Sequence, residues 1–202
     1  FLHKKLFSVQ DLCNRHFGIG ADGVIFVIRS KESNDAKMII YNSDNSEAEM
    51  CGNGIRCLIE YLSKENIPLK ESFKIETKAG IKLAKYNKGK ISVKMGGPIL
   101  EPKLIPTTIY NFNNDLPYSL FKVNDFKSIG YAVGMGNPHL IFFVDELKKI
   151  NHSDIGSKLE KSNLFPEKTN VHFCQILDSN NINVKVWERG AGETLACGTG
   201  AC

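Results

Sequence analysis

Long apolar runs are missing from this sequence, and so is a surplus of one charge along any stretch. No run approaches the roughly 18 apolar residues of a membrane-spanning helix, so we expect no membrane association. The net charge of +4 is spread over interleaved lysines and glutamates, which gives no basic stripe for a nucleic acid. We therefore expect a cytoplasmic protein, or a plastid or other organellar one if a targeting segment precedes Phe1.

Closely spaced cysteine pairs are missing as well. The six cysteines form no CxxC pair, and the step from Cys51 to Cys57 does not match a zinc knuckle, so we expect no metal site. A chain of 202 residues with 42% hydrophobic residues builds an ordinary core and does not need disulfide bonds to hold it. We therefore expect reduced thiols. Four of them are interpreted as structural: Cys13, Cys57, Cys174 and Cys202.

One motif occurs twice in the chain. NSDNSEAEMCGNGIRC spans residues 42–57, and ERGAGETLACGTGAC spans residues 188–202. When Cys51 is aligned with Cys197, the glycines one and three residues after each cysteine coincide, and so do the glutamates four residues before it. Asn42 then falls on Glu188. The repeat predicts two related halves, each presenting one thiol at a glycine-flanked turn.

Hydrophobic periodicity predicts the elements of the first half. Helical spacing is shown by Leu2, Leu6, Val9 and Cys13. Buried strands are expected at residues 24–28 and 37–42, and a three-stranded meander at residues 73–95. The residues between 43 and 50 are mostly small or polar, which is typical of a loop. A second helix should begin near Cys51, and its buried stripe is Ile55, Leu58, Ile59 and Leu62.

The segment GGPILEPKLIP, residues 96–106, contains three prolines and is interpreted as the crossing between two domains, 1–96 and 97–202. Beyond it, five strands are expected at residues 120–123, 129–133, 140–144, 171–177 and 182–187. A polar helical region is expected over residues 145–162. The pattern as a whole predicts an α/β chain of the α+β type.

A thiol at the start of a helix has a particular chemistry. Unpaired backbone N–H groups and the positive end of the helix dipole lower the pKa of such a thiol, which makes it a usable base. The same N–H groups bind a carboxylate, and glycines allow a ligand close to the backbone. Two facing helix starts would place one α-carbon between two sulfurs. One thiolate would remove the α-proton and the other thiol would deliver one to the opposite face, inverting the configuration.

Four motifs carry a resemblance to a known family. The two cysteine motifs, together with RHFGIGADG at residues 15–23 and MGNPH at residues 135–139, are similar to those of the diaminopimelate epimerases. The resemblance implies two pseudo-symmetric domains, each a curled mixed or antiparallel sheet around a central helix, with the site in the cleft between them. It also implies interconversion of LL- and meso-diaminopimelate for lysine and peptidoglycan-precursor synthesis, with no cofactor. The implied partner is the small-molecule substrate, and a homodimer is an open expectation.

The resemblance also assigns roles to single residues. Cys51 and Cys197 match the acid/base pair, and His139 and Glu188 match residues that assist the thiols. The helix-start amides that hold the reacting carboxylate correspond to Gly52, Asn53, Gly198 and Thr199. Positions that contact the substrate, several at its distal end, correspond to Asn42, Asn137, Asn170, Glu188 and Arg189. A distal ammonium suits carboxylate or amide oxygens, and a distal carboxylate suits the guanidinium of Arg189.

Three alternatives stay open. A proline-racemase-like or hydroxyproline-epimerase-like enzyme also uses two cysteines, but those relatives usually have histidine where this chain has Asn53, and they lack the ERGAGET lead-in. A non-catalytic binding relative would be marked by loss of one cysteine, and both are present. A redox protein would pair Cys51 with Cys197, and we expect such a bond to inactivate rather than to function.

The repeat and the family also mark departures. Asn45 stands where a glycine is common in the family, and asparagine tolerates the left-handed conformation better than other non-glycine residues. If the halves match, on the order of 45 residues after Cys202 and roughly 20 before Phe1 would complete them. We therefore expect an incomplete chain in which the second half exposes part of its core and is poorly stable alone.

Overall fold

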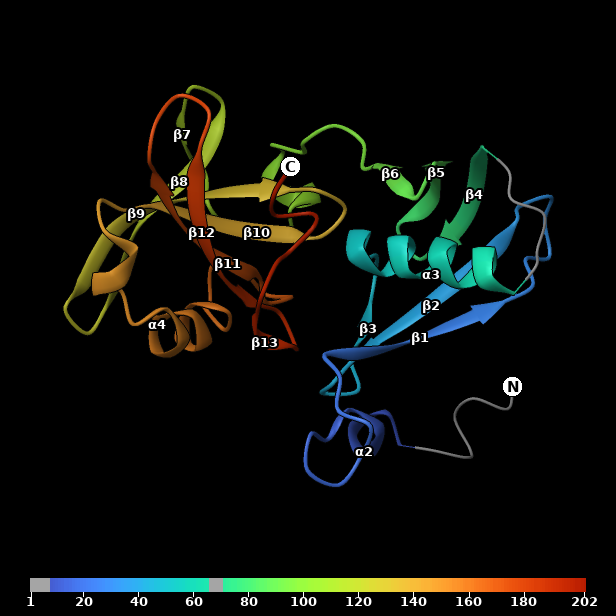
Figure 1. Cartoon of the computed structure of the whole chain (residues 1–202). Coiled ribbons are helices and arrows are strands. Elements are labelled where there is room, and N and C mark those ends of the chain that lie inside the picture. Colours follow the sequence, from blue (N-terminus) through green and yellow to red (C-terminus); the bar gives the residue numbers. More distant parts are fainter. Residues whose placement is uncertain (1–7, 66–70) are drawn as a thin grey trace. The chain divides into compact units, whose positions relative to one another are not determined.

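A computed structural model of the protein describes residues 8–65 and 71–202 (Figure 1). By its internal contacts the chain divides into two units, Phe1–Gly96 and Gly97–Cys202. Each unit contains its own sheet and its own hydrophobic core. This mixed α+β architecture in two units confirms the predicted fold class. Within the described ranges, no helix combines the length and the apolar character that crossing a bilayer requires.

The first unit is built on a six-stranded sheet. Its strand order is β1-β2-β4-β5-β6, and β3 pairs with β2. The bounds are β1 Gly23–Ile28, β2 Ala36–Asn42, β3 Glu47–Ala48, β4 Ser72–Thr77, β5 Gly80–Asn87 and β6 Lys90–Lys94. β2 and β4 pair in parallel, and the other neighbours are antiparallel. Strands β4, β5 and β6 form the predicted meander.

Helix α3 (Gly52–Lys64) packs into the curve of this sheet (Figure 1). It contacts β1 and β2 as well as β5 and β6, so the sheet curls around it. The predicted stripe is confirmed, because its four members are at most 5% exposed: Ile55, Leu58, Ile59 and Leu62. Burying each such side chain contributes about 1.5–3 kcal/mol, which makes this stripe the main support of the helix. The thiol motif therefore starts on the best-anchored helix of the unit.

The short helix α2 (Val9–Cys13) precedes the first sheet. The hydroxyl of Ser8 caps it by accepting a hydrogen bond from the Asp11 N–H at 3.3 Å. Val9 and Cys13 pack with Tyr41 in a small apolar cluster, as the helical spacing predicts. The other two members of that predicted stripe, Leu2 and Leu6, lie outside the described residues.

The second unit is built on a seven-stranded sheet with the order β13-β12-β11-β10-β9-β8-β7. The bounds are β7 Asn111–Asn113, β8 Leu116–Val123, β9 Phe126–Gly134, β10 Pro138–Phe143, β11 Asn170–Ile176, β12 Ile182–Glu188 and β13 Gly192–Thr194. Only β10 and β11 pair in parallel among the described strands of this sheet. Their crossover contains the 3-10 helix η2 (Leu147–Lys149) and helix α4 (His152–Leu159).

The two faces of this sheet differ. One face packs against α4 and the segment around the 3-10 helix η1 (Pro102–Leu104), around a core that includes Phe142 and Phe173. The strand register places a second apolar set on the opposite face. These side chains are 39–62% exposed: Leu120, Ile129, Phe143, Ile176, Ile182 and Val184. His139 and His172 belong to the same face and are buried, so the polar pair lies beside an open apolar surface.

Several elements differ from the sequence predictions. The short strands β3, β7 and β13 were not predicted, because two or three residues are too few for a readable alternation. The predicted polar helix over residues 145–162 is wrong in extent, since only η2 and α4 form within it. The residues after Cys197 form a single turn, in which the Ala201 N–H donates to the Cys197 carbonyl at 3.1 Å. The second thiol therefore lies at the start of this turn.

Candidate active site

Cys51 is the N-cap residue of α3. Its φ of −139° is extended, and its sulfur accepts a hydrogen bond from the Gly54 N–H at 3.2 Å. The first turn contains no acidic residue, so no side chain of that turn offsets the positive end of the helix. A Cβ at Gly54 would lie 3.0 Å from Ile25 Cδ1 and 3.5 Å from the sulfur of Cys51. Glycine at position 54 therefore keeps the thiol close to the helix backbone.

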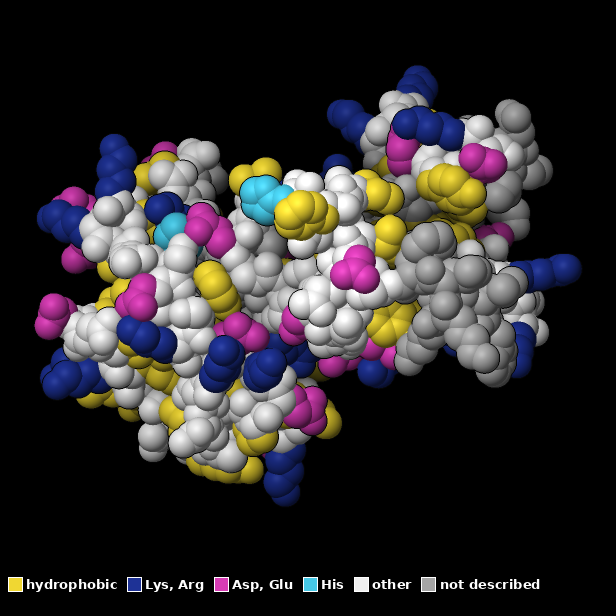
Figure 2. Space-filling view, turned by 90° about the horizontal axis from the view of Figure 1, so that it is seen from below, with side chains coloured by type: hydrophobic (Ala, Val, Ile, Leu, Met, Phe, Trp, Pro, Cys, Tyr) yellow, Lys and Arg dark blue, Asp and Glu magenta, His cyan; other side chains and the backbone are white. Residues whose placement is uncertain are grey.

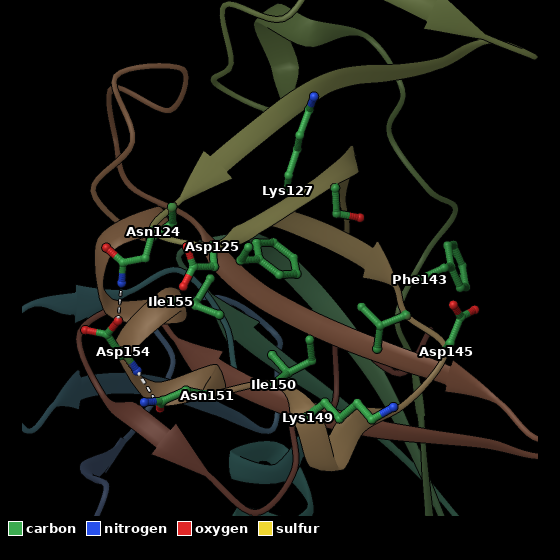
Figure 3. A pocket seen from close by; sticks show the side chains of 14 residues that line it. Asn124, Asp125, Lys127, Phe143, Asp145, Lys149, Ile150, Asn151, Asp154 and Ile155 are labelled. Atoms are coloured by element: carbon green, nitrogen blue, oxygen red, sulfur yellow. Dashed lines mark hydrogen bonds between the residues drawn. The ribbon is translucent and has the colours of Figure 1, made fainter.

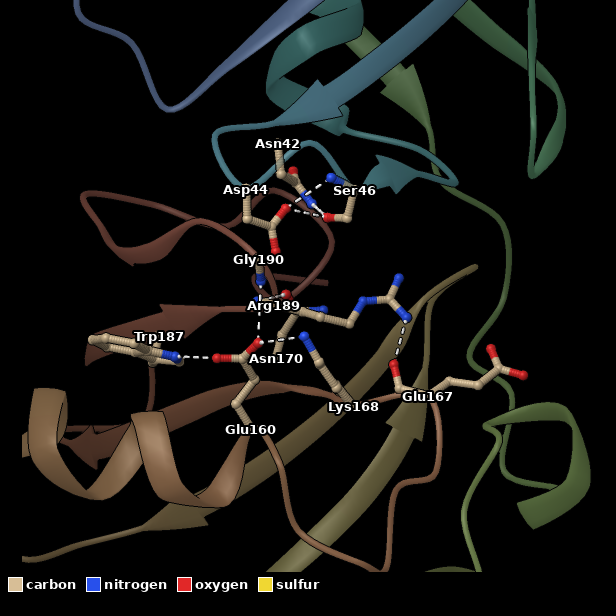
Figure 4. A network of polar contacts seen from close by, with 10 residues as sticks. All are labelled: Asn42, Asp44, Ser46, Glu160, Glu167, Lys168, Asn170, Trp187, Arg189 and Gly190. Carbon is tan, nitrogen blue, oxygen red and sulfur yellow. Dashed lines mark hydrogen bonds and ion pairs between the residues drawn. The ribbon is translucent and has the colours of Figure 1, made fainter. Parts of the chain in front are cut away.

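The loop before this helix is held by local hydrogen bonds. Asn42, the last residue of β2, donates its side-chain N–H to the Ser46 hydroxyl at 3.0 Å, and the Ser46 N–H donates to Asp44 at 2.9 Å (Figure 4). Asn45 has a φ of +68°, so the prediction that asparagine accepts the left-handed conformation here is confirmed. This loop leads the chain from β2 through β3 to Cys51.

Cys197 lies in a different environment in the second unit. It is 6% exposed, and its sulfur is 3.3 Å from the Thr199 hydroxyl. Burial raises the pKa of the Cys197 thiol to about 12, and the nearby Glu188 carboxylate adds to the rise. The expectation that a helix start lowers this pKa is therefore wrong for Cys197, because burial and a negative neighbour outweigh the turn's N–H groups. At neutral pH this cysteine carries its proton.

Two buried histidines lie beside this cysteine. His139 on β10 and His172 on β11 are each 1% exposed, and Nδ1 of His139 is 2.9 Å from Nε2 of His172. The other ring nitrogen of His139 is 2.8 Å from the side-chain oxygen of Asn137. Because an amide oxygen only accepts, His139 carries its proton on Nε2 and accepts at Nδ1 from His172. Nδ1 of His172 is buried and has no hydrogen-bond partner within residues 8–65 and 71–202.

Both histidines are neutral in this environment. Burial lowers the pKa of His139 well below 6.5, and the neighbouring His172 and Arg189 lower it further. Burial lowers the pKa of His172 to about 4. Neutral imidazoles keep a lone pair that can accept a proton or bind a metal ion. One donor atom each from His139, His172 and Cys197 lies within 4.8 Å of the others, and these donors are of the type that binds zinc.

The ERGAGET segment is held by side chains from other strands (Figure 4). Asn170 is 3% exposed, donates to the Pro138 carbonyl at 2.8 Å and accepts from the Arg189 N–H at 3.0 Å. The Arg189 guanidinium donates to the Glu167 carbonyl at 3.2 Å. The Glu188 carboxylate accepts from the Thr194 hydroxyl at 2.5 Å. Asn137, Asn170, Glu188 and Arg189, which were predicted to contact substrate, thus also brace the protein itself.

Glu160 supports the same segment from below. It is 5% exposed, accepts from the indole N–H of Trp187 at 2.8 Å and from the Gly190 N–H at 3.3 Å. The ammonium of Lys168 is 4.0 Å away (Figure 4). Gly190 and Gly192 have φ of +74° and +81°, which favours glycine at both positions of this turn.

Within the second unit the structure brings five of the predicted residues together with His172, and it places Glu160 against the neighbouring Trp187 and Gly190; sequence reasoning missed both His172 and Glu160. The predicted residues are Asn137, His139, Glu188, Cys197 and Thr199. Asn137 lies at hydrogen-bond distance from His139, and the sulfur of Cys197 lies near His139, Thr199 and Glu188. The missed ones are His172 and Glu160. Neither residue belongs to a motif. The only sign of His172 in the sequence is a polar side chain in the strongly apolar strand VHFC, and the only sign of Glu160 is a polar side chain at the end of a helix.

A separate hollow of about 590 Å³ opens elsewhere on the second unit (Figure 3). The turn at residues 123–128 and the segment from η2 to α4 line it. Its polar groups bond to one another, since Asn124 donates to Asp154 at 2.9 Å and the Asp154 N–H donates to Asn151 at 3.3 Å. None of the predicted site residues lines this hollow, so the candidate site is the cysteine cluster and not this cavity.

The charged side chains do not form one basic face on the side of the molecule that Figure 2 shows. On the side that Figure 2 shows, basic and acidic side chains are interspersed. Among the described residues, several basic side chains pair with acidic neighbours, for example Lys37 with Glu76 and Lys158 with Asp154.

A family model described as diaminopimelate epimerase matches residues 2–101 and 131–202. The chain is 51% identical over 196 residues to a diaminopimelate epimerase of Prochlorococcus marinus (strain NATL1A), covering 96% of this chain and 69% of the relative. It is 44% identical over 200 residues to a chloroplastic diaminopimelate epimerase of Oryza sativa subsp. japonica, covering 95% and 56%.

Solved structures give a likeness of fold alone. A probable proline racemase from Agrobacterium radiobacter K84 aligns with a TM-score of 0.67 at 15% identity, covering 95% of this chain and 61% of that one. A hydroxyproline epimerase from Agrobacterium vitis aligns with a TM-score of 0.64 at 15% identity, with the same two shares covered. The chain spans 69% of the length of the Prochlorococcus marinus diaminopimelate epimerase and 61% of the length of each of these two solved structures.

Proposed function

We propose, from the premise that the chain belongs to the diaminopimelate epimerase family, that it interconverts LL- and meso-diaminopimelate. The reaction inverts one α-carbon by removing and returning a proton, so the protein is an isomerase. It would serve lysine and peptidoglycan-precursor synthesis. The identity of 45–51% to several diaminopimelate epimerases supports this reading over a proline racemase, to which the chain is 15% identical.

The observation that carries the proposal is Cys51 at the start of α3. Its sulfur lies at the first turn of a thirteen-residue helix and accepts a hydrogen bond from the Gly54 N–H at 3.2 Å. The backbone N–H groups of this turn suit a substrate α-carboxylate, whose developing charge they would stabilise in the transition state. Asn53, in the same first turn, would add its amide to the carboxylate site.

Cys197 is proposed as the second acid/base group. Its raised pKa favours the protonated thiol, which is the form that donates a proton. The scheme requires one thiolate and one thiol on opposite faces of the same carbon. Gly198 and Thr199 would donate backbone N–H groups to the substrate carboxylate. His139 and Glu188 lie near the Cys197 sulfur and would assist its proton transfer.

Substrate recognition is proposed for the braced ERGAGET region. The carboxylate of Glu188 and the amide oxygens of Asn42, Asn137 and Asn170 suit the distal ammonium, and the Arg189 guanidinium suits the distal carboxylate. The thiol pair supplies both base and acid, so the scheme contains no pyridoxal phosphate and no metal. We propose a cytoplasmic or plastid location, and a homodimer as the assembly to test by light scattering.

The decisive experiment follows the substrate α-hydrogen in deuterated water, using the intact protein under reducing conditions. We expect deuterium to enter the α-position as LL- and meso-diaminopimelate interconvert. Cys51→Ala and Cys197→Ala should each lower inversion by roughly 10²–10⁴-fold or more, because each removes a general acid/base. Cys57→Ser and Cys202→Ser change exposed thiols to which we assign no role in the reaction; they are the matched controls and should keep wild-type rates.

Two outcomes would overturn the proposal. Normal inversion in Cys51→Ala or in Cys197→Ala would refute the two-base scheme. Exchange with proline or hydroxyproline, and none with diaminopimelate, would favour the proline-racemase-like alternative that shares the fold.

A further inference from the structure

We infer that His139, His172 and Cys197 form a binding site for one divalent cation of the zinc type, which acts as an inhibitor and not as a cofactor. The three donors are two imidazoles and one thiol, a set that suits zinc and cobalt better than magnesium or calcium. They come from β10, β11 and the turn after β13, so their separation in sequence hides them from spacing rules. That the bound cation inhibits the enzyme rests on the proposed function, whereas its binding to the three side chains does not.

The distances lie within reach of zinc geometry. The donor atoms are within 4.8 Å of one another, and the two imidazole nitrogens that face each other are 2.9 Å apart. Tetrahedral zinc with nitrogen at about 2.0 Å and sulfur at about 2.3 Å holds neighbouring donors about 3.3–3.5 Å apart. The histidine pair must therefore open by a few tenths of an ångström, and the most distant donors must close by roughly 1.3 Å.

The surroundings already resemble the outer shell of a metal site. A metal-binding histidine usually donates its second ring N–H to an oxygen, and the His139 Nε2–H points to the Asn137 side-chain oxygen at 2.8 Å. Nδ1 of His172 has no partner in the described structure although the residue is 1% exposed, so this nitrogen can take the proton that Nε2 gives up when it binds the metal.

The backbone fixes this cluster as well. A Cβ on Gly200 would lie 2.1 Å from Cε1 of His172, so the turn that follows Cys197 lies directly against the imidazole ring. The Cys197 sulfur and the His172 ring thus cannot move far apart while this contact holds. Such preorganisation favours a chelating site over three independent side chains.

Binding leaves a simple balance of atoms. Two nitrogen–metal bonds and one sulfur–metal bond form. The S–H bond of Cys197 breaks and its proton leaves to solvent, while the Nε2–H bond of His172 breaks and its proton moves to Nδ1 of the same ring. Both imidazoles stay neutral, and no electron is transferred. Because the sulfur's electron pair is then held by the metal, Cys197 can neither take nor give the substrate proton, so turnover stops in proportion to occupancy.

The experiment titrates the reduced full-length chain with Co²⁺, whose thiolate ligation gives a charge-transfer band in the near ultraviolet. We expect one Co²⁺ per chain, displaced by one Zn²⁺. Cys197→Ala and His172→Gln should weaken Co²⁺ binding by at least the roughly 10–100-fold that loss of an outer partner costs. The matched controls, Cys57→Ser and His16→Gln, alter exposed residues outside the cluster and should bind as the wild type does.

A band that persists in His172→Gln, or that disappears in Cys57→Ser, would overturn the site. Circular dichroism checks that each variant is folded, and Cys197→Ala, the smaller change, carries the test if His172→Gln is not. In the activity assay, one equivalent of Zn²⁺ should abolish epimerisation and a chelator should restore it. Zinc bound at the cluster with full turnover would uphold the site and contradict the role of Cys197, so the two failures are separable.

Discussion

The indole N–H of Trp187 donates a hydrogen bond to the buried carboxylate of Glu160 over 2.8 Å. The second oxygen of the same carboxylate accepts from the Gly190 N–H at 3.3 Å. One side chain at the end of α4 therefore holds both ends of the turn that carries Glu188 and Arg189. The candidate substrate site depends on a residue that we assign no contact with substrate.

The first prediction concerns Glu160→Ala. The change leaves the Trp187 and Gly190 N–H groups without their partner, so we expect the free energy of unfolding to fall by about 1–3 kcal/mol for each group left buried. KM for diaminopimelate should rise as Arg189 loses its position. Urea denaturation and steady-state kinetics measure the two effects.

The matched control for this change is Glu146→Ala, whose carboxylate pairs with Lys149 at an exposed site. Exposed pairs contribute about 0–1 kcal/mol, so this variant should be nearly as stable as the wild type. Equal loss of stability in the two variants would show that the buried network has no special role.

The second prediction distinguishes two substitutions of His172. The side-chain amide of His172→Gln can still donate to Nδ1 of His139, whereas His172→Leu cannot, and the leucine variant leaves that nitrogen unpaired. We expect His172→Gln to keep most of kcat and His172→Leu to lose it, with little change in KM. Nitrogen-15 NMR of the His139 ring reports which nitrogen carries the proton in each variant. Similar kcat in both variants would mean that His172 only fills space.

The third prediction is a pH dependence of stability. Glu193 accepts hydrogen bonds from Ser153 at 2.6 Å and from His152 at 2.9 Å, which tie β13 to α4. The Ser153 contact, then the His152 contact, lower the pKa of Glu193 below 4.5. A lowered carboxyl pKa stabilises the fold above the unfolded value, and this contribution is lost as the pH falls through the folded value.

Urea midpoints measured from neutral to acid pH check this sign. The wild type should lose stability below the ordinary glutamate value of 4.5 more steeply than Glu193→Gln does, because the amide has no proton to gain. Ser153→Ala removes the largest cause of the shift and should fall between them. A Glu193→Gln profile parallel to that of the wild type would contradict the assignment.

The fourth prediction tests the contact between Gly200 and His172. Gly200→Ala forces a shift, since its Cβ would lie 2.1 Å from the ring, and overpacking of this kind costs about 1–3 kcal/mol. The second change His172→Ala should relieve the strain, giving a coupling energy of about 0.5–3 kcal/mol in a double-mutant cycle. Gly97→Ala is the control, because nothing lies within 4 Å of the added Cβ and its φ is ordinary. Additive effects at positions 172 and 200 would refute the contact.

Sequence periodicity was sufficient for the elements that carry their own signal. The stripe of α3 and the meander of β4, β5 and β6 have regular apolar spacing, and both form as predicted. The position of Cys51 followed from the polar loop and the helix that flank it. Strands of two or three residues, such as β13, carry no such pattern, because tertiary pairing and not local preference determines them.

The electrostatic environment of the candidate site could not be predicted from hydrophobic periodicity. The pKa of Cys197 is raised because strands and turns bury it beside Glu188, whereas the sequence motif predicts a lowered pKa. The pairing of His139 with His172 joins residues 33 apart through parallel strands β10 and β11. Such contacts arise only once the sheet order is known.

The close approach of the Gly200 backbone to the His172 ring also constrains which substitutions can accumulate at positions 172 and 200 during evolution. A side chain at position 200 is tolerated only after the imidazole has been replaced by something smaller, and a bulkier ring at position 172 would be rejected while the turn keeps its path. The two sites are therefore expected to change together across descendants of this chain, in an order that passes first through position 172.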